Sequence, residues 1–223
     1  MLPLWDATPH RRAPVMTVLL ILANLAIFAV EIWLTLTKRI DPFIGEYALV
    51  PRRLFAHWNE GAQWLPVLTH MFLHWGVAHV LGNCWFLWIF GKNVEDRLGS
   101  FSFLVLYLLS GLAAATLQVI VEPDSLVPMI GASGAISGVL GAYLLLFPTG
   151  WILTLVPWVV PILPVPAFAF LVLWFVIQAF NGVGSLFASH SGGGVAWWAH
   201  AGGFAAGMVL LAVARSAGLV RRR

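Results

Sequence analysis

Charged residues are scarce in this sequence. Asp, Glu, Lys and Arg make up 9% of its 223 residues, whereas 61% of the residues are hydrophobic. A water-soluble domain carries about 25% charged residues and an apolar share nearer one half, so the composition excludes that class. Because a bilayer core takes about 20 apolar residues per helical span, the apolar content predicts a polytopic membrane protein with about six spans.

Cysteine and basic residues are also few. The single cysteine, Cys84, cannot form an intramolecular disulfide and lies in an apolar run, so it does not indicate a redox compartment. The twelve Lys and Arg residues give a net charge of +3, and many of them lie at chain ends or at the ends of hydrophobic runs. This distribution is typical of membrane topology signals and argues against a nucleic-acid partner.

Six hydrophobic segments are interpreted as membrane helices, and together they predict an all-α, six-transmembrane-helix bundle over residues 15–214. The first is too long for a cleavable signal peptide and lacks a small-x-small exit, which favours a retained anchor helix. The six segments are 15–36, 77–92, 101–121, 133–147, 165–184 and 196–214.

Two stretches interrupt the apolar runs. Residues 37–76 are too polar to span a bilayer, and their tryptophans suit a partly interfacial loop. Residues 148–166 contain five prolines and no charge. Because closely spaced prolines break a helix, we expect an irregular loop at the membrane surface there, with a seventh span as the alternative.

The basic residues predict the orientation of the chain. An even number of spans places both termini on one side, and eight of the twelve Lys and Arg residues would lie on that side. We therefore predict cytoplasmic tails at 1–14 and 215–223, with the second, fourth and sixth helices beginning at the outer face. The eight residues are Arg11, Arg12, Lys92, Arg97, Arg215, Arg221, Arg222 and Arg223.

Polar side chains recur at the outer starts of these three helices. His79 and Asn83 lie near the start of the second, Ser133 starts the fourth, and His200 lies near the start of the sixth. With a rise of 1.5 Å per residue, His200 would be only about 6 Å below its helix start. Because polar residues at membrane depth are costly and usually functional, the sequence predicts a shallow polar pocket open to the extracytoplasmic side.

Glycine spacing predicts how the fourth and sixth helices meet. Small residues repeated on one helix face allow close backbone approach in a membrane. Packing of the two faces would bring His200 beside Ser133. The two sets are Gly134, Gly138 and Gly141 on the fourth helix, and His200, Gly203 and Gly207 on the sixth.

A serine beside an imidazole suits nucleophilic attack on a carbonyl, because the histidine takes the serine proton. The Ser133 amide, at a helix start, and the side chains of Asn83 and His79 are candidate donors to the oxyanion. The acidic residue Glu31 belongs to the first helix and is expected to be distant. The pattern therefore favours a Ser-His dyad over a triad.

Four motifs resemble those of the rhomboid family of intramembrane serine proteases, over roughly residues 15–214. Gly131-Ala132-Ser133-Gly134 is similar to the GxSG motif of its nucleophile, and residues 199–207, AHAGGFAAG, resemble its AHxxGxxxG motif. Residues 74–83, HWGVAHVLGN, resemble its HxxxxHxxxN element, and residues 91–99, GKNVEDRLG, resemble its turn into the third helix. Motif order and spacing agree with the six-helix plan.

The resemblance implies roles for five residues: Ser133 as nucleophile, His200 as general base, Asn83 and His79 in the oxyanion hole, and Trp174 at a lateral substrate gate. It also implies that the partners are single-span transmembrane protein substrates in the lipid bilayer. The expected reaction is hydrolysis of a peptide bond within or just outside the transmembrane segment. The resemblance implies no cofactor and no metal.

Two positions depart from the family pattern. The first loop of the family often carries a Trp-Arg pair, whereas Trp64 is followed here by Leu65. The position four residues after the nucleophile is often an aromatic residue stacked on the histidine, and here it is Ser137. Another group must therefore orient His200.

Alternative interpretations of single residues are weaker. His70 and His74 have metal-ligand spacing, but the acid of HExxH is absent. His79 and Asn83 would alternatively form a structural pair that ties the second helix to the first loop. The GxSxG elbow of soluble hydrolases fails because Ala135 replaces its second glycine and no parallel-sheet pattern surrounds it.

Alternative functions of the whole chain are also weaker. The main one is a catalytically inactive rhomboid-like protein that binds membrane clients; it is disfavoured because both Ser133 and His200 are present. A small transporter would usually show inverted repeats or broken helices in both halves, and neither is found. The compact plan, with no appended soluble domain, favours a bacterial plasma membrane.

Overall fold

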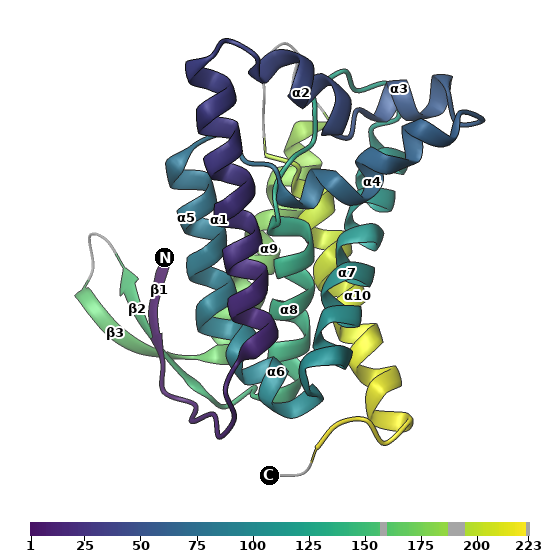
Figure 1. Cartoon of the computed structure of the whole chain (residues 1–223). Coiled ribbons are helices and arrows are strands. Elements are labelled where there is room, and N and C mark those ends of the chain that lie inside the picture. Colours follow the sequence, from purple (N-terminus) through teal and green to yellow (C-terminus); the bar gives the residue numbers. More distant parts are fainter. Residues whose placement is uncertain (157–159, 187–194, 222–223) are drawn as a thin grey trace.

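The structure, a computed structural model, describes residues 1–156, 160–186 and 195–221, so Arg222 and Arg223 of the predicted C-terminal tail lie outside the described residues. It is a helical bundle in which all six predicted membrane segments are helical (Figure 1). Within these described ranges, four helices are long and apolar enough to cross a membrane. They are α1 (Val15–Leu36), α7 (Ser100–Val121), α9 (Ala167–Ser185) and α10 (Trp197–Ser216).

The second and fourth predicted segments differ from regular membrane-spanning α-helices. The second begins with α5 (Val77–Phe86), passes through one π-helical stretch, η3 (Leu87–Gly91), and continues as α6 (Lys92–Leu98), so it runs six residues beyond the predicted end at 92. The fourth is α8 (Ser133–Leu146), which is shorter than a normal span. It stands at the centre of the bundle, with most of its side chains buried (Figure 1). A helix that is apolar on all sides is buried in this way.

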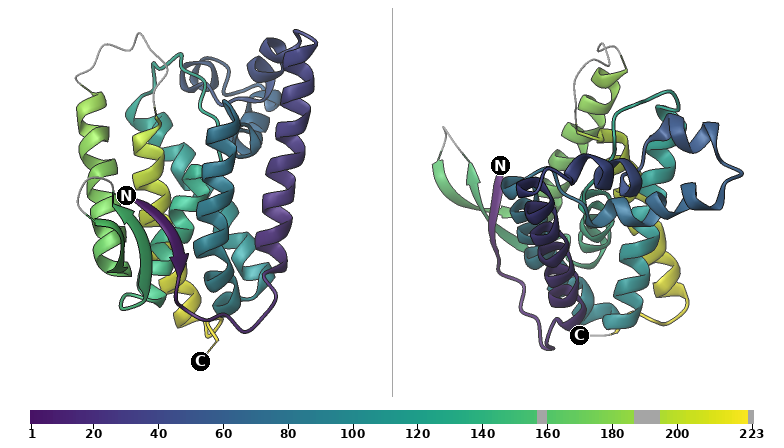
Figure 2. Two further views of the ribbon diagram at one scale, coloured as in Figure 1. Left: turned by 90° about the vertical axis from the view of Figure 1, so that its left-hand side faces the viewer. Right: turned by 45° about the horizontal axis from the view of Figure 1, so that its top comes forward.

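The first loop folds into short helices at the end of the bundle where α1 finishes (Figure 2). Its Trp58, Trp64 and Trp75 are exposed, as an interfacial position requires. The loop elements are α2 (Ile40–Tyr47), α3 (Pro51–Ala56), η1 (Gly61–Trp64), α4 (Leu65–Thr69) and η2 (His70–Phe72).

A small antiparallel sheet lies beside the half of α5 that is farther from the first loop (Figure 2). The presence of this sheet corrects the expectation for residues 148–166. That stretch is not an irregular loop, because it contains β2 (Trp151–Val156) and β3 (Val160–Pro166). The third strand, β1 (Leu2–Asp6), pairs with β2 and comes from the predicted N-terminal tail. The prolines of this stretch disfavour a helix, but β3 is an edge strand, where a missing backbone donor is tolerated.

The close packing of α8 on α10 was predicted from the glycines and is confirmed. A Cβ atom on Gly203 would collide with the Gly134 carbonyl, and one on Gly207 would collide with the Gly138 carbonyl. Only glycine leaves room for this approach. We call this glycine-lined contact between the two helices the α8–α10 seam.

Candidate active site

The site lies in a recess above the start of α8. With 14 residues, α8 extends only about 21 Å, whereas the hydrocarbon core of a bilayer is about 30 Å thick. The segment before it descends into the bundle and is held by backbone hydrogen bonds with the first loop. Leu49 and Met129 exchange two such bonds of 2.7 and 3.2 Å, and the Gly131 N–H donates to the His70 carbonyl at 2.8 Å. The first loop thus fixes where α8 begins.

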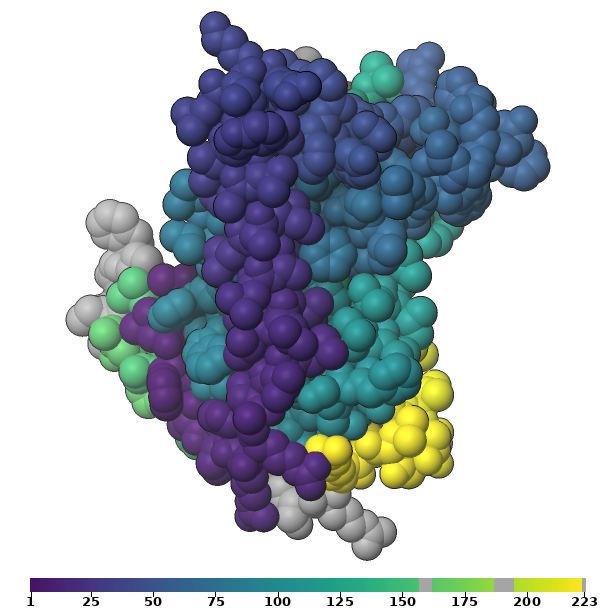
Figure 3. All heavy atoms as spheres, viewed as in Figure 1, coloured from purple at the N-terminus to yellow at the C-terminus, as the bar shows by residue number. Residues whose placement is uncertain are grey.

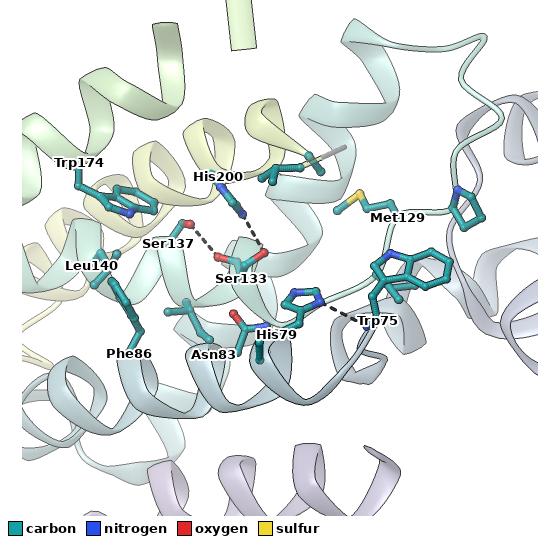
Figure 4. Close-up of a pocket in the computed structure, with 17 residues that line it drawn as sticks. Trp75, His79, Asn83, Phe86, Met129, Ser133, Ser137, Leu140, Trp174 and His200 are labelled. Carbon is teal, nitrogen blue, oxygen red and sulfur yellow. Dashed lines mark hydrogen bonds between the residues drawn. The ribbon is translucent and has the colours of Figure 1, made fainter. Parts of the chain in front are cut away.

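Ser133 and His200 meet across the seam, as the sequence predicted. The His200 Nε2 atom lies 2.8 Å from the Ser133 Oγ atom, and both side chains are half-buried (Figure 4). The neighbouring Ser137 hydroxyl donates instead to the Ser133 carbonyl at 2.7 Å. The imidazole is therefore placed to accept the proton of one particular hydroxyl, because Ser137 is already bonded to the helix backbone.

Gln178 of α9 is the residue that our sequence interpretation missed. Its Oε1 atom lies 2.8 Å from the His200 Nδ1 atom, on the far side of the ring from Ser133. The side chain is buried, with 7% of its surface exposed. A signal was present, because a glutamine within a membrane span is itself costly, but we considered only polar residues at helix starts. Gln178 is therefore the group that contacts the His200 ring at Nδ1.

Asn83 and His79 of α5 face Ser133 from the opposite wall (Figure 4). The His79 Nδ1 atom accepts the Trp75 backbone N–H at 3.3 Å, so in the neutral ring the proton lies on Nε2. The buried Asn83 amide nitrogen has no hydrogen-bond partner among the described residues. The His79 ring also packs closely against Gly131, where a Cβ would lie only 2.7 Å from the His79 Nε2 atom. Glycine suits this position for a second reason, because its φ is 123°.

All five predicted site residues line one pocket of about 410 Å³, which also contains the apolar side chains of Phe86, Ile136 and Leu140. The Trp174 ring lies 5.9 Å from the His200 ring, tilted by 33°, so it supplies the aromatic neighbour that Ser137 does not. Trp174 and Phe86 lie at the same end of the pocket, on α9 and α5 (Figure 4). The pocket therefore combines the polar Ser133–His200 pair with an apolar wall.

Three other titratable residues do not contact the Ser133–His200 pair: His70, His74 and Glu31. Burial lowers the pKa of His70 to about 4, and burial together with the proximity of His79 lowers the pKa of His74 to about 4. Glu31 accepts the His74 backbone N–H at 3.1 and 3.2 Å and is not bonded to His200. Within the described part of the chain, no group of three or more His, Cys, Asp or Glu side chains is placed to hold a metal ion.

Comparisons with known proteins identify the family of the chain. The profile of the Rhomboid domain matches residues 61–217, well over half of the chain. Rhomboid protease GluP of Bacillus subtilis is 42% identical over 82 residues, which are 37% of this chain and 16% of that protein. RHOMBOID-like protein 6, mitochondrial, of Arabidopsis thaliana is 32% identical over 117 residues, covering 51% of this chain and 38% of the relative.

A third relative, Rhomboid-like protein 11, chloroplastic, of Arabidopsis thaliana, is 37% identical over 87 residues, covering 39% of this chain and 30% of that protein. The chain spans less than half of the length of each of these relatives. The domain match, however, includes α5 to α10 and every residue of the pocket described above. This multi-pass membrane chain belongs to the rhomboid family.

Proposed function

We propose that the chain is an intramembrane serine endopeptidase that cleaves transmembrane segments of membrane proteins. The observation that carries the proposal is the 2.8 Å contact between the His200 Nε2 and Ser133 Oγ atoms at the bottom of a recess within the bundle. Both residues are fixed on the α8–α10 seam, so the contact does not depend on a mobile loop. Precise placement of nucleophile and base accounts for a large part of catalysis in such sites.

The chemistry follows from the positions of the donors and acceptors. His200 takes the proton as Ser133 Oγ attacks the peptide carbonyl, and the oxyanion accepts hydrogen bonds from the Ser133 amide, Asn83 and His79. His200 then gives the proton to the leaving amine, which breaks the peptide bond. Water then attacks the acyl-enzyme carbonyl as His200 takes a proton from it. His200 returns this proton to Ser133 Oγ as the ester bond breaks and the carboxylic acid product leaves. No cofactor or metal takes part.

The substrates are single-span membrane proteins that enter laterally from the lipid bilayer between α5 and α9, past Trp174. The apolar pocket wall of Phe86, Ile136 and Leu140 supports this entry, because it suits an apolar segment better than a soluble peptide. The site opens to the extracytoplasmic side, with both termini in the cytoplasm, and the membrane is a bacterial plasma membrane. The excess of basic residues on the side of the termini supports this orientation.

Covalent labelling of the full chain in detergent by a fluorophosphonate tests the reaction. The wild type is expected to react, whereas Ser133→Ala and His200→Ala are not. Ser137→Ala is the matched control, because it removes a hydroxyl one turn away and is expected to label normally. Equal labelling of all four proteins would overturn the proposal.

Cleavage of a single-span substrate in liposomes tests the substrate class. The wild type is expected to produce two fragments and Ser133→Ala none. Cleavage that persists in Ser133→Ala would contradict the proposed nucleophile. Binding of the substrate without labelling or cleavage in any variant would instead favour a client-binding protein without catalytic activity.

A further inference from the structure

The side chain of Gln178 lies where the acid of a serine protease triad would lie. It reaches His200 from α9, and its Oε1 atom is 2.8 Å from Nδ1, while Nε2 on the other side of the ring is 2.8 Å from Ser133. Resting on the proposed function, we propose that Gln178 is a positioning residue that holds His200 in the tautomer able to accept the Ser133 proton. Gln178 acts through His200 and does not touch the substrate.

A second hydrogen bond of the same amide fixes its direction. The Gln178 Nε2 atom donates to the Trp174 carbonyl, at 3.4 Å, one turn earlier on α9. A carbonyl only accepts, so the amide nitrogen faces Trp174 and the amide oxygen faces His200. A flipped amide would set two oxygens against each other and lose this bond. The orientation of Gln178 is therefore determined by its own helix.

The direction of the amide decides where the imidazole proton lies. Since Oε1 can only accept, His200 must carry its proton on Nδ1. Its Nε2 atom is then unprotonated and faces Ser133 Oγ, as a general base requires. With the opposite tautomer, Nε2 would be a donor and could not take the serine proton. The bond from the Gln178 amide to the Trp174 carbonyl thus fixes the His200 tautomer in which Nε2 can accept the serine proton.

The surroundings leave this role to Gln178. The rings of Trp174 and Trp197 flank His200 at 5.9 and 6.2 Å, but an indole offers no acceptor lone pair to Nδ1. His79, across the pocket, is the titratable group that faces His200. The other described polar neighbours of the first turn of α10, Gln118 of α7, Ser133 of α8 and Gln178 of α9, are uncharged. A neutral acceptor also avoids the cost of a carboxylate at membrane depth.

Gln118 provides a matched control. It is also buried, and its Oε1 atom accepts the backbone N–H of Ala199, the residue before His200, at 3.1 Å. Both glutamines therefore bind the first turn of α10, one through the backbone and the other through the catalytic ring. A loss of helix anchoring would affect both variants, whereas a loss of tautomer control would affect only Gln178.

The experiment compares Gln178→Met, Gln178→Glu and Gln118→Met as full chains in liposomes, with kcat, KM and the pH profile of substrate cleavage as readouts. Gln178→Met keeps the side-chain volume but has no comparable acceptor, and it is expected to lower kcat about 10- to 100-fold with KM unchanged. Gln178→Glu keeps the acceptor and is expected to retain kcat near the wild-type value at high pH. Its acidic limb is expected to move to higher pH, because a carboxylate stabilises the imidazolium.

Gln118→Met is expected to lower the thermal midpoint while leaving kcat and the pH profile unchanged. The inference is overturned if Gln178→Met keeps the wild-type kcat. It is also overturned if Gln178→Met and Gln178→Glu lose kcat equally without a pH shift, because that result indicates a packing role. Both results presuppose an active wild type, whereas failure of the proposed function would appear as an inactive wild type or an active Ser133→Ala.

Discussion

The seam that holds Ser133 and His200 differs from the helices that face it. Along the α8–α10 seam the backbones touch, and most of α8 is buried. Figure 3 shows one face of the bundle, with α1 in purple running down its front. Helix α9, which carries Trp174 and Gln178, exposes many large apolar side chains, among them Phe168, Val176 and Phe180. Ser133 and His200 are thus on a contact where the backbones touch, whereas Trp174 and Gln178 are on a helix at the periphery of the bundle.

On the proposed function, this difference separates two requirements of intramembrane proteolysis. The distance between Ser133 and His200 must stay constant through the reaction, and close backbone packing fixes it. On the same proposal, a transmembrane substrate enters from the side, and α9, which lies outside the α8–α10 seam, can move without disturbing that distance. Because Gln178 is on α9, a displaced α9 would also withdraw the acceptor from His200.

The largest expected effect is on the facing helix α5. Asn83→Ala removes a side-chain donor from the wall opposite Ser133 and is expected to lower kcat about 100- to 1,000-fold, because oxyanion stabilisation is lost. Asn24→Ala is the matched control: Asn24 is a fully buried asparagine of α1, so its loss is expected to affect stability without the same loss of rate. Substrate cleavage at saturating concentration measures the effect, and a wild-type rate in Asn83→Ala would assign it the structural role.

The next effect tests the seam itself. Gly207→Ala places a Cβ against the Gly138 backbone and is expected to lower the free energy of unfolding by about 3 kcal/mol. Gly184→Ala on α9 meets nothing within 4 Å, and its effect is expected to stay within about 0.5 kcal/mol. Denaturation in detergent measures both. Equal effects at the two glycines would show that the seam is no more constrained than α9.

The first loop holds the start of α8 in place through backbone hydrogen bonds. Its contribution to the stability of the protein is expected to fall at acid pH. Burial lowers the pKa of His70 from its ordinary 6.5 to about 4, so between these values the unfolded chain binds more protons and stability falls as pH falls. For His70 the loss reaches about 2 kcal/mol at pH 5. His70→Asn keeps a donor for the Pro66 carbonyl and is expected to reduce this dependence.

Thermal midpoints at pH 7.5 and 5 measure the change. His57→Asn is the control, because the His57 side chain is exposed and, among the residues described, is bonded only to Glu60. An unchanged pH dependence in His70→Asn would contradict a protonation effect at this residue. The buried His74, whose pKa is also lowered to about 4, accounts for the part of the dependence that is expected to remain.

The sequence predicted the features that depend on local spacing. Apolar runs predicted the six helices, and the glycines predicted that α8 and α10 touch, because each pattern repeats within one helix face. Gln178 was missed because it lies in the middle of α9, away from the helix starts where polar residues were compared, and no glycine pattern relates α9 to α10. The strands were missed for a similar reason. Pairing of β1 with β2 joins Leu2 to Leu155, a long-range contact that proline content cannot indicate.

The smallest expected effect concerns that sheet. The Trp85 indole N–H of α5 donates to the Pro3 carbonyl of β1 at 2.7 Å, and the Lys92 ammonium lies 4.8 Å from the Trp5 ring centroid. Trp85→Phe removes the bond and is expected to cost about 1 kcal/mol of stability. Trp88→Phe is the control for loss of an indole. Trp88 lies on the adjoining η3, and its ring, like that of Trp5, is close to the Lys92 ammonium. Protease protection of residues 1–14 is the specific readout, because a released β1 exposes this segment. If Trp85→Phe leaves that protection unchanged, the position of β1 does not depend on its bond to α5.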